Sequence, residues 1–446
     1  MKWFSFFIAA MMATNVFAGN SLALQAGGVR AETDRTWYLA GEAMTVSVTV
    51  ERQRVDASAE VGTSAETDAI IAYAELCDTY SLAAGVAISL KGGKGEGVIE
   101  LPTNLHSGYY MLSVYTRHNA SVSQRLVAIV NPLHRSEDDN IEWVEAEDSL
   151  STDGTAAANS SFLILNSSFK PYPETEGHII RARIQNVYDG HRFRGSQIRP
   201  SLSIVGKQIH YFEGKMENDS IAVFYTFGIH GKQPLVLSAA TSTGVSLPIE
   251  MISPFACLLP KELPNLVFHY KRSEVEARSL DMQRHQIAIA PAKRELQLGD
   301  YSDDTAEDGV PLDYDETLFG VKPDLTYNLD EYRQFLTIRE VLLEYVKCVR
   351  RGKVNGVPQL FVRKEDAHYN SSWPAMVLID GMPVNDIERL LNYDARRVHY
   401  INIYGGQYTF GNGVYNGILS LISRSGRLTN YPTEPNVQYL VYEFPE

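Results

Sequence analysis

Acid–base catalysis is the first chemistry to test for here, because the sequence holds 54 aspartates and glutamates. Adjacent carboxylates such as Asp303 and Asp304 lie in acidic stretches that have the composition of loops. Solvated carboxylates keep an ordinary pKa, which makes them poor general acids or bases. His368 and His399 fall in the same C-terminal region, where histidines more often sit at the surface or at strand ends. No constellation indicates a catalytic site, so the sequence predicts a protein that is not an enzyme.

Phosphate, nucleophile and metal sites have recognisable spacings. We find no Gly-x-Ser-x-Gly elbow, no His-Glu-x-x-His helix and no Walker loop. The glycine-rich run at 92–97 resembles a phosphate loop in composition, but no helix follows it to bind a phosphate, and a hairpin turn is expected. The acidic run at 300–316 does not follow the calcium-binding register of an EF-hand. The sequence therefore predicts neither a metal nor a cofactor.

Asp380 is the single residue that most suggests a site. It follows an apolar run at the expected end of a strand, where a carboxylate can contact a ligand or a partner. The alternative is that Asp380 and Gly381 make a tight turn, since glycine accepts a positive φ. We favour the turn.

The elements around Asp380 make up a small mixed α/β unit. Residues 376–379 are uniformly apolar, as in a strand buried on both faces. Asn385 is placed to cap a helix over 387–391, and 398–404 alternates as a strand does. A glycine-rich loop that includes Gly405 and Gly417 then leads into a last strand at 418–423. Upstream, Thr337 and Glu340 form a capping box for another helix, and a strand at 360–362 is expected to pair with 376–379.

The glycine-rich loop also carries aromatic and amide side chains. Tyrosine supplies large and fairly rigid contact area with a polar tip, which suits protein recognition. We interpret the loop either as backbone turns alone or as an exposed surface that binds a partner. The residues of this possible partner-binding surface are Tyr404, Gln407, Tyr408, Phe410, Tyr415 and Asn416.

The rest of the chain is predicted to be mostly β. Short alternating runs separated by turn residues indicate two antiparallel β-sandwiches before the mixed unit. The fold class is therefore mostly β with a C-terminal α+β domain. The predicted segments are a signal peptide (1–18), a first sandwich (19–132), an acidic linker (133–150), a second sandwich (151–260), an acidic connector with little regular structure (261–330), the mixed unit (331–430) and a C-terminal tail (431–446).

Charge and composition limit where the protein acts. Lys2, an apolar run and Val16-Phe17-Ala18 have the pattern of a secretory signal, and no later stretch is long and apolar enough to span a bilayer. A net charge of −14 argues against nucleic-acid binding. The three cysteines, Cys77, Cys257 and Cys348, are too far apart for a disulfide framework, so buried thiols are expected, with one long-range bridge as the alternative.

Two sets of motifs resemble known families. Residues 379–383 (I-D-G-M-P), with Pro383 in the motif's last position, 401–403 (I-N-I), Tyr404-Gly405 and Asn416-Gly417-Ile418 occur in the order seen in the plug domain of TonB-dependent receptors. The receptors continue into a long barrel, whereas this sequence stops at Glu446, so the resemblance does not imply transport. Asp34-Arg35, Trp37-Tyr38, Ala40-Gly41-Glu42 and a later Ser107-Gly108-Tyr109 resemble the macroglobulin-like β-sandwich of exported proteins. The thioester motif of protease-trapping macroglobulins is absent.

These resemblances imply an exported cell-envelope protein of the Bacteroidetes type. We expect it to bind other proteins, and to dock on an outer-membrane assembly through its plug-like unit, in the periplasm, at the outer membrane or on the cell surface. The alternative is a ligand-capture protein that binds glycan or peptide in association with TonB-dependent uptake. An enzyme whose site assembles from dispersed residues is the third hypothesis.

Overall fold

The computed structural model describes residues 28–50, 71–117, 121–144, 177–205, 209–294, 314, 318, 320–363, 373–410, 413–424, 426, 428, 431–432 and 434–445, with the backbone alone for 285–294, 410 and 413. The predicted signal peptide lies outside these residues, as does the acidic pair Asp303 and Asp304. The chain forms two compact units, one of residues 1–175, 255–288 and 445–446, the other of 176–254 and 289–444. The chain thus enters each unit more than once. The predicted segments, in contrast, follow one another as separate domains along the sequence.

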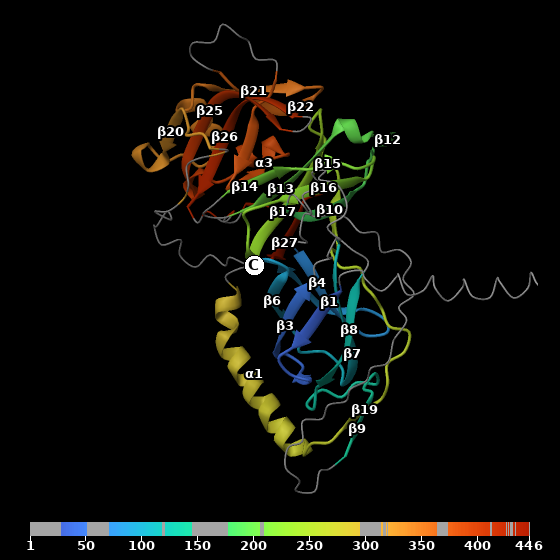
Figure 1. Cartoon of the computed structure of the whole chain (residues 1–446). Coiled ribbons are helices and arrows are strands. Elements are labelled where there is room, and N and C mark those ends of the chain that lie inside the picture. Colours follow the sequence, from blue (N-terminus) through green and yellow to red (C-terminus); the bar gives the residue numbers. More distant parts are fainter. Residues whose placement is uncertain are drawn as a thin grey trace, which may run out of the picture. The chain divides into compact units, whose positions relative to one another are not determined.

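The first unit contains a β-sandwich in which every strand pair is antiparallel except β2 with β8 (Figure 1). One sheet has the order β1-β3-β6, with bounds Val29–Thr33, Ala43–Val50 and Lys94–Glu100. The other has the order β2-β8-β7-β4-β5, with bounds Trp37–Leu39, Val122–Val130, Gly108–Thr116, Ile71–Cys77 and Leu82–Ser89. Alternate residues such as Met44 and Val46 of β3 and Ala72 and Ala74 of β4 are buried in one core. This period of two produces the two-layer arrangement.

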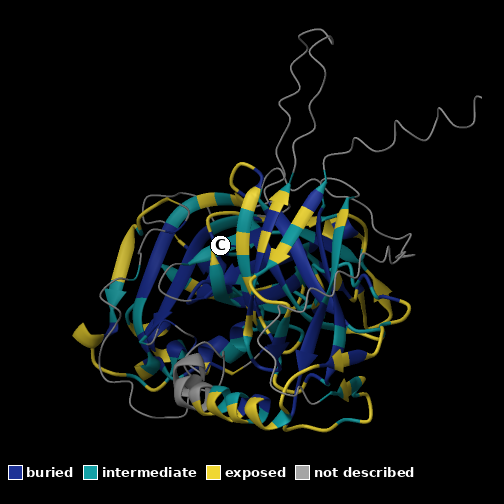
Figure 2. Cartoon of the chain, turned by 60° about the horizontal axis from the view of Figure 1, so that its bottom comes forward, coloured by how far each residue is buried: buried dark blue, intermediate teal, exposed yellow. Residues whose placement is uncertain are grey.

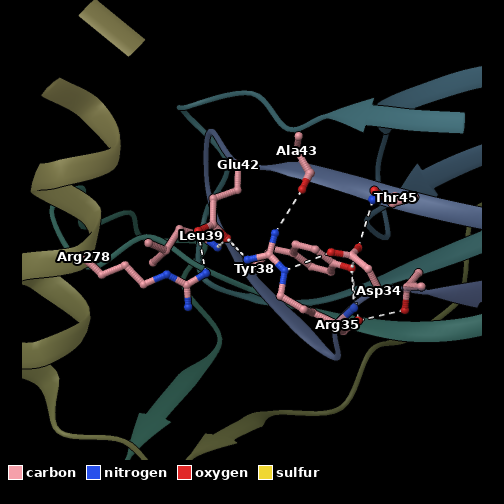
Figure 3. Close-up of polar contacts among 9 residues, drawn as sticks. Asp34, Arg35, Tyr38, Leu39, Glu42, Ala43, Thr45 and Arg278 are labelled. Carbon is pink, nitrogen blue, oxygen red and sulfur yellow. Dashed lines mark hydrogen bonds and ion pairs between the residues drawn. The ribbon is translucent and has the colours of Figure 1, made fainter. Parts of the chain in front are cut away.

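The Asp34-Arg35 motif stabilises a corner of this sandwich (Figure 3). The Asp34 carboxylate accepts a 2.6 Å hydrogen bond from the Tyr38 hydroxyl and a 3.0 Å bond from the Thr45 backbone N–H. Arg35 forms an ion pair with Glu42 at 3.1 Å. These hydrogen bonds, outweighing burial, lower the pKa of Asp34. The motif residues therefore hold the turn between β1 and β3.

A second layer of the first unit uses residues from both predicted acidic segments. Strand β9 (Ile141–Trp143) pairs in parallel with β19 (Leu266–Phe268), and helix α1 (Arg272–Arg294) follows. Arg278 of α1 also pairs with Glu42. The prediction of a bare linker at 133–150 is therefore wrong for β9, and the acidic connector predicted at 261–330 contains one strand and one helix here. The apolar residues of β9, β19 and α1 lie within the two predicted acidic segments, and they pack against Trp37 in a small core.

A buried carboxylate holds the chain where it returns to the first unit. Glu75 of β4 is fully buried and accepts hydrogen bonds from the backbone N–H groups of Cys257 and Leu258 and from the Tyr115 hydroxyl. The ring of Phe255 packs directly on Gly85, where a Cβ would lie only 2.7 Å from the ring. Burial raises the pKa of Glu75 in spite of these hydrogen bonds.

The second unit begins with another sandwich. One sheet has the order β15-β16-β10-β18, with bounds Lys215–Met216, Ile221–Thr226, His178–Ile184 and Ile249–Ile252. The facing sheet has the order β14-β13-β17-β27, with bounds His210–Glu213, Ile198–Ile204, Gly231–Thr241 and Gln438–Phe444. A small hairpin, β11 (Val187–Tyr188) with β12 (His191–Arg192), and a 3-10 turn at Gly195–Gln197 complete it.

The C-terminal residues form a strand of this sandwich. The predicted tail at 431–446 is wrong, because β27 pairs along β17 in the register Leu235↔Leu440. Tyr442 and Phe444 of β27 are buried in the sandwich core. The alternation of Leu440, Tyr442 and Phe444 is the local signal for this strand, whereas its partner lies about two hundred residues away.

The plug-like part of the second unit contains a five-stranded mixed sheet. Its order is β20-β25-β26-β23-β24, with bounds Leu325–Asn328, Val398–Phe410, Gly413–Ser423, Met376–Ile379 and Met382–Pro383. Strand β23 is parallel to β26, while the other pairs are antiparallel. The glycine-rich segment predicted as a loop is thus mainly the paired ends of β25 and β26.

Two short helices and a hairpin cover this sheet. Helix α2 (Ile338–Glu344) begins at the predicted capping box of Thr337 and Glu340. Helix α3 (Ile387–Leu391) is capped by Asp386 rather than by Asn385. Strand β22 (Val357–Val362) pairs with β21 (Val349–Val354), so its predicted pairing with residues 376–379 is wrong. The Asn355-Gly356 turn, with φ of 49° and 85°, favours this local hairpin. Single 3-10 turns occupy Leu329–Glu331 and Ala395–Arg397.

The predicted fold class is confirmed, since β-sandwiches dominate and the C-terminal part is mixed. Buried residues follow the strands, as the dark blue segments in Figure 2 show. Cys77, Cys257 and Cys348 are free thiols. No helix in the described part of the chain has the length and apolar character needed to cross a membrane.

The pairing of β27 generates a stability prediction. Phe444→Ala should lower the free energy of unfolding of the second unit by roughly 3–5 kcal/mol, because Phe444 is 1% exposed and its removal leaves a cavity. Val441→Ala on the same strand should cost about 0.5 kcal/mol or less, since Val441 is 39% exposed. Urea unfolding of the full chain measures both. Equal effects of the two substitutions would show that β27 is not part of the core.

Candidate functional site

Asp380 and Gly381 make the turn between β23 and β24. Their φ angles are 48° and 87°, the pattern of a type I′ hairpin turn. Asp380 is 1% exposed and accepts hydrogen bonds from the Ser423 backbone N–H at 2.7 Å, the Ser423 hydroxyl at 2.6 Å and the Leu428 backbone N–H at 2.7 Å. Burial outweighs these bonds and raises the pKa of Asp380. The carboxylate therefore has a structural role within this fold.

The residues of the predicted partner-binding surface do not form one exposed loop. Tyr404 is 2% exposed and packs with Met376 and Ile418, and Tyr408 and Tyr415 pack against the same cluster. In contrast, Gln407 is exposed and Asn416 is half-buried. The backbone of Phe410 ends β25, but its side chain lies outside the described part of the structure.

The positions of the other residues of the plug-like motif explain why each is a glycine or a proline. At Gly417 φ is 87°, and a Cβ there would lie 2.7 Å from Val362. The Gly405 backbone N–H donates to Asp324, which ties the bulged part of β25 to the chain before β20. Pro383 lies in β24, opposite Leu378. These residues determine backbone geometry and close packing.

A cavity of about 90 Å³ lies inside the second unit, between the sandwich and the plug-like sheet. Asn385 donates to the Ser238 hydroxyl at 3.1 Å, and Ser238 is 3.3 Å from the Ser201 hydroxyl. Tyr211 and Tyr415 also line the cavity. Its lining residues include no carboxylate, histidine or cysteine. Small-molecule sites usually enclose roughly 300–1,000 Å³, so this cavity has room for only a few water molecules or one small group.

His399 is the only one of the two singled-out histidines that the structure describes. Its Nε2 lies 3.4 Å from Asp330, which also pairs with Arg424. Burial lowers the pKa of His399. The arrangement is an ion-pair cluster on the plug-like sheet, and the described residues contain no group of three or more potential metal ligands.

The sequence analysis missed an apolar surface on α2. Leu336 and Leu343 are 65% and 69% exposed, although Ile338, Val341 and Leu342 of the same segment are buried. Leu343 lies in α2, whereas Leu336 directly precedes its N-cap Thr337. The signal for Leu343 was present in the sequence, because it falls outside the apolar face at i, i+3 and i+4.

Comparisons with known proteins give no family. No family model matches the sequence, and no curated protein matches it. Among solved structures, Escherichia coli alpha-2-macroglobulin activated by porcine elastase is similar over 53% of this chain and 20% of its own, with 10% identity and a TM-score of 0.19. Latent PorU from Porphyromonas gingivalis is similar over 52% and 25%, with 11% identity and a TM-score of 0.17. The Yersinia pseudotuberculosis adhesin InvE is similar over 51% and 60%, with 10% identity and a TM-score of 0.16.

The chain spans only part of each of these structures, and TM-scores this low carry no argument about fold or function. The macroglobulin-like resemblance rests on the N-terminal motifs. The plug-like resemblance stays a prediction that rests on motif order.

The turn at Gly381 generates the second prediction. A Cβ at Gly381 would lie 2.4 Å from Ile209 of the sandwich. A residue with a side chain would also have to adopt the strained left-handed backbone conformation there. Gly356, with a φ of 85° and open space around it, is the matched control. Gly356→Ala should cost roughly 1–2 kcal/mol through φ alone, and Gly381→Ala clearly more. Equal losses in denaturant unfolding would contradict the close packing at Gly381.

The buried carboxyl of Asp380 generates the third prediction, on pH. Its folded pKa lies above its ordinary value, so the folded state binds the proton more tightly than the unfolded state. That contribution to stability is fully present below about pH 4 and is lost as the pH rises through the folded pKa. The unfolding free energy of the natural chain minus that of Asp380→Asn should therefore fall as the pH rises from about 4. Denaturant unfolding at several pH values measures it, and a pH-independent difference would contradict the raised pKa.

Proposed function

We propose that this is an exported, non-catalytic protein of the cell envelope that binds another protein through the plug-like part of its second unit. The observation that carries the proposal is the pair of exposed leucines at α2: Leu336, just before the N-cap, is 65% exposed, and Leu343 within the helix is 69% exposed. Large apolar side chains that gather on a surface and are flanked by polar residues are typical of protein–protein contact sites. Docking on an outer-membrane assembly is the specific form of the proposal, and it rests on the plug-like motifs.

The use of the buried carboxylates supports a non-catalytic role. Asp380, Glu75 and Glu434 have raised pKa values because they are buried. Each accepts hydrogen bonds from backbone N–H groups or hydroxyls, and none is among the residues that line the cavity. Their perturbed pKa values are explained by structure, as in many buried ion and hydrogen-bond networks.

The ligand-capture alternative requires a concave, aromatic-lined site of ligand size. The cavity beside Tyr211 and Tyr415 has the aromatic residues, but its volume of about 90 Å³ leaves no room for a glycan or a peptide. Protein binding through an exposed surface is the better-supported function.

Capture of a partner tests the proposal. The tagged full chain is crosslinked in envelope fractions of its native host and compared with Leu336→Ser/Leu343→Ser. We expect the variant to lose the captured membrane protein, while its unfolding free energy changes by no more than about 0.5 kcal/mol per site, because both side chains are exposed.

The matched control replaces two other exposed apolar residues of the second unit. Val187→Ser/Tyr188→Ser removes side chains that are 54% and 51% exposed on the β11–β12 hairpin. This control should capture the partner as the natural chain does. Equal capture by all three proteins, or none by the natural chain, would refute binding through α2.

A further inference from the structure

The hairpin next to α2 has a charge opposite to that of the whole chain. Residues 345–363 contain five basic residues and no aspartate or glutamate, although the net charge of the chain is −14. All five are exposed. We call β21, β22 and these flanking residues the basic hairpin, and its cations are Lys347, Arg350, Arg351, Lys353 and Arg363.

The basic hairpin is a fixed element, so its charges are held in place. Leu360 and Val362 of β22 are buried in the same core as Ile387 and Leu390 of α3. The Arg350 guanidinium lies over the ring of Phe361 at 4.5 Å, which limits the freedom of the side chain. A surface on an anchored hairpin loses less entropy when a partner binds.

The two helices next to the hairpin carry three carboxylates. Glu388 of α3 pairs with Arg339 of α2 at 2.7 Å and with Arg351 of the hairpin at 3.5 Å. Glu340 is committed to the capping box of α2, and Glu344 is exposed at the end of that helix. Among the described residues of the hairpin and α2, together with Glu388, six cations stand against three carboxylates, which leaves a positive excess.

The charges lie beside the apolar surface of α2. The shared contact with Glu388 joins α2 to the hairpin, and the Lys347 ammonium donates to the Leu343 backbone carbonyl at 2.7 Å. The Leu343 end of α2 and the basic hairpin therefore lie next to each other. Charged rims around an apolar centre are a usual arrangement at protein interfaces.

The strands of the hairpin also offer backbone groups. Among the described residues, β21 and β22 form a sheet of two strands. The outer edge of such a hairpin can accept an additional strand through main-chain hydrogen bonds. Arg350 and Arg351 are consecutive in β21 and point to opposite faces. A strand along this edge reaches both arginines, whereas a flat membrane surface reaches one face only.

We propose that the basic hairpin binds an extended, acidic segment of the protein partner, whose carboxylates pair with Arg350, Arg351 and Lys353. This proposal rests on the proposed function and adds the chemistry of the partner. The leucines of α2 supply apolar contact, and the hairpin selects an acidic strand and sets its direction. An anionic lipid surface is the competing ligand, and the test separates the two.

The experiment measures binding of the full chain to a short fluorescent peptide of alternating glutamate and valine. We expect Arg350→Gln/Arg351→Gln/Lys353→Gln to weaken the affinity roughly tenfold or more, since each exposed ion pair contributes up to about 1 kcal/mol. The control Lys91→Gln/Lys94→Gln/Arg192→Gln, which removes three exposed cations elsewhere, should bind as the natural chain does. Affinity should also fall between about 0.1 M and about 1 M salt.

Three results of the binding measurements would overturn the proposal, and a fourth comes from the capture experiment. One is a natural chain that does not bind the peptide, and another is a triple hairpin variant that binds it unchanged. The third is hairpin-dependent binding to phosphatidylglycerol vesicles without binding to the peptide, which would identify a lipid surface instead. If the hairpin variant still captures the partner and Leu336→Ser/Leu343→Ser does not, the acidic-segment proposal fails while the proposed function stands.

Discussion

The second unit depends on one buried carboxylate. Asp380 ends β23, and its three hydrogen bonds fix Ser423 at the end of β26 and Leu428 on the path toward the C-terminus. A buried acceptor of this kind is costly unless it is fully hydrogen-bonded, so the donors and the turn must form together. Gly381 then packs against Ile209 of the sandwich. One residue thus couples the turn, the parallel strand pair and the contact between sandwich and plug-like sheet.

The route of the chain extends this coupling. After Leu428 the chain reaches β27, which completes a sheet whose other strands come from residues 198–241. Glu434 on this path accepts hydrogen bonds from the Asn385 backbone N–H and the Tyr431 hydroxyl. The plug-like part is therefore an insertion between strands of one sandwich, and its core includes Val205 and Val236 of that sandwich. Non-local closure of this kind makes the second unit one cooperative structure.

Features that depend only on neighbouring residues could be predicted from the sequence. The capping box of Thr337 and Glu340 and the turn at Asp380 need only neighbouring residues, and both were predicted from the sequence. The partner of β27 could not be predicted, because any unpaired apolar strand of the right length satisfies the same pattern. The predicted exposure of the aromatic residues of β25 was wrong for a different reason. A bulge between Tyr404 and Gln407 shifts the register, and a shift of one residue exchanges the buried and exposed faces.

The difference between buried and exposed charges is also why we propose recognition at α2 and the basic hairpin. The acidic residues that first suggested chemistry are either buried acceptors, as Asp380 is, or lie outside the described chain. The cations of the hairpin remain at the surface because Leu360 and Val362 anchor the strand beneath them. Exposed charges steer and orient a partner more than they add affinity, while desolvated apolar side chains supply most of the binding energy. The hairpin supplies the charges, and Leu336 and Leu343 supply the apolar side chains. A partner that matches only the charge or only the apolar contact should therefore bind weakly.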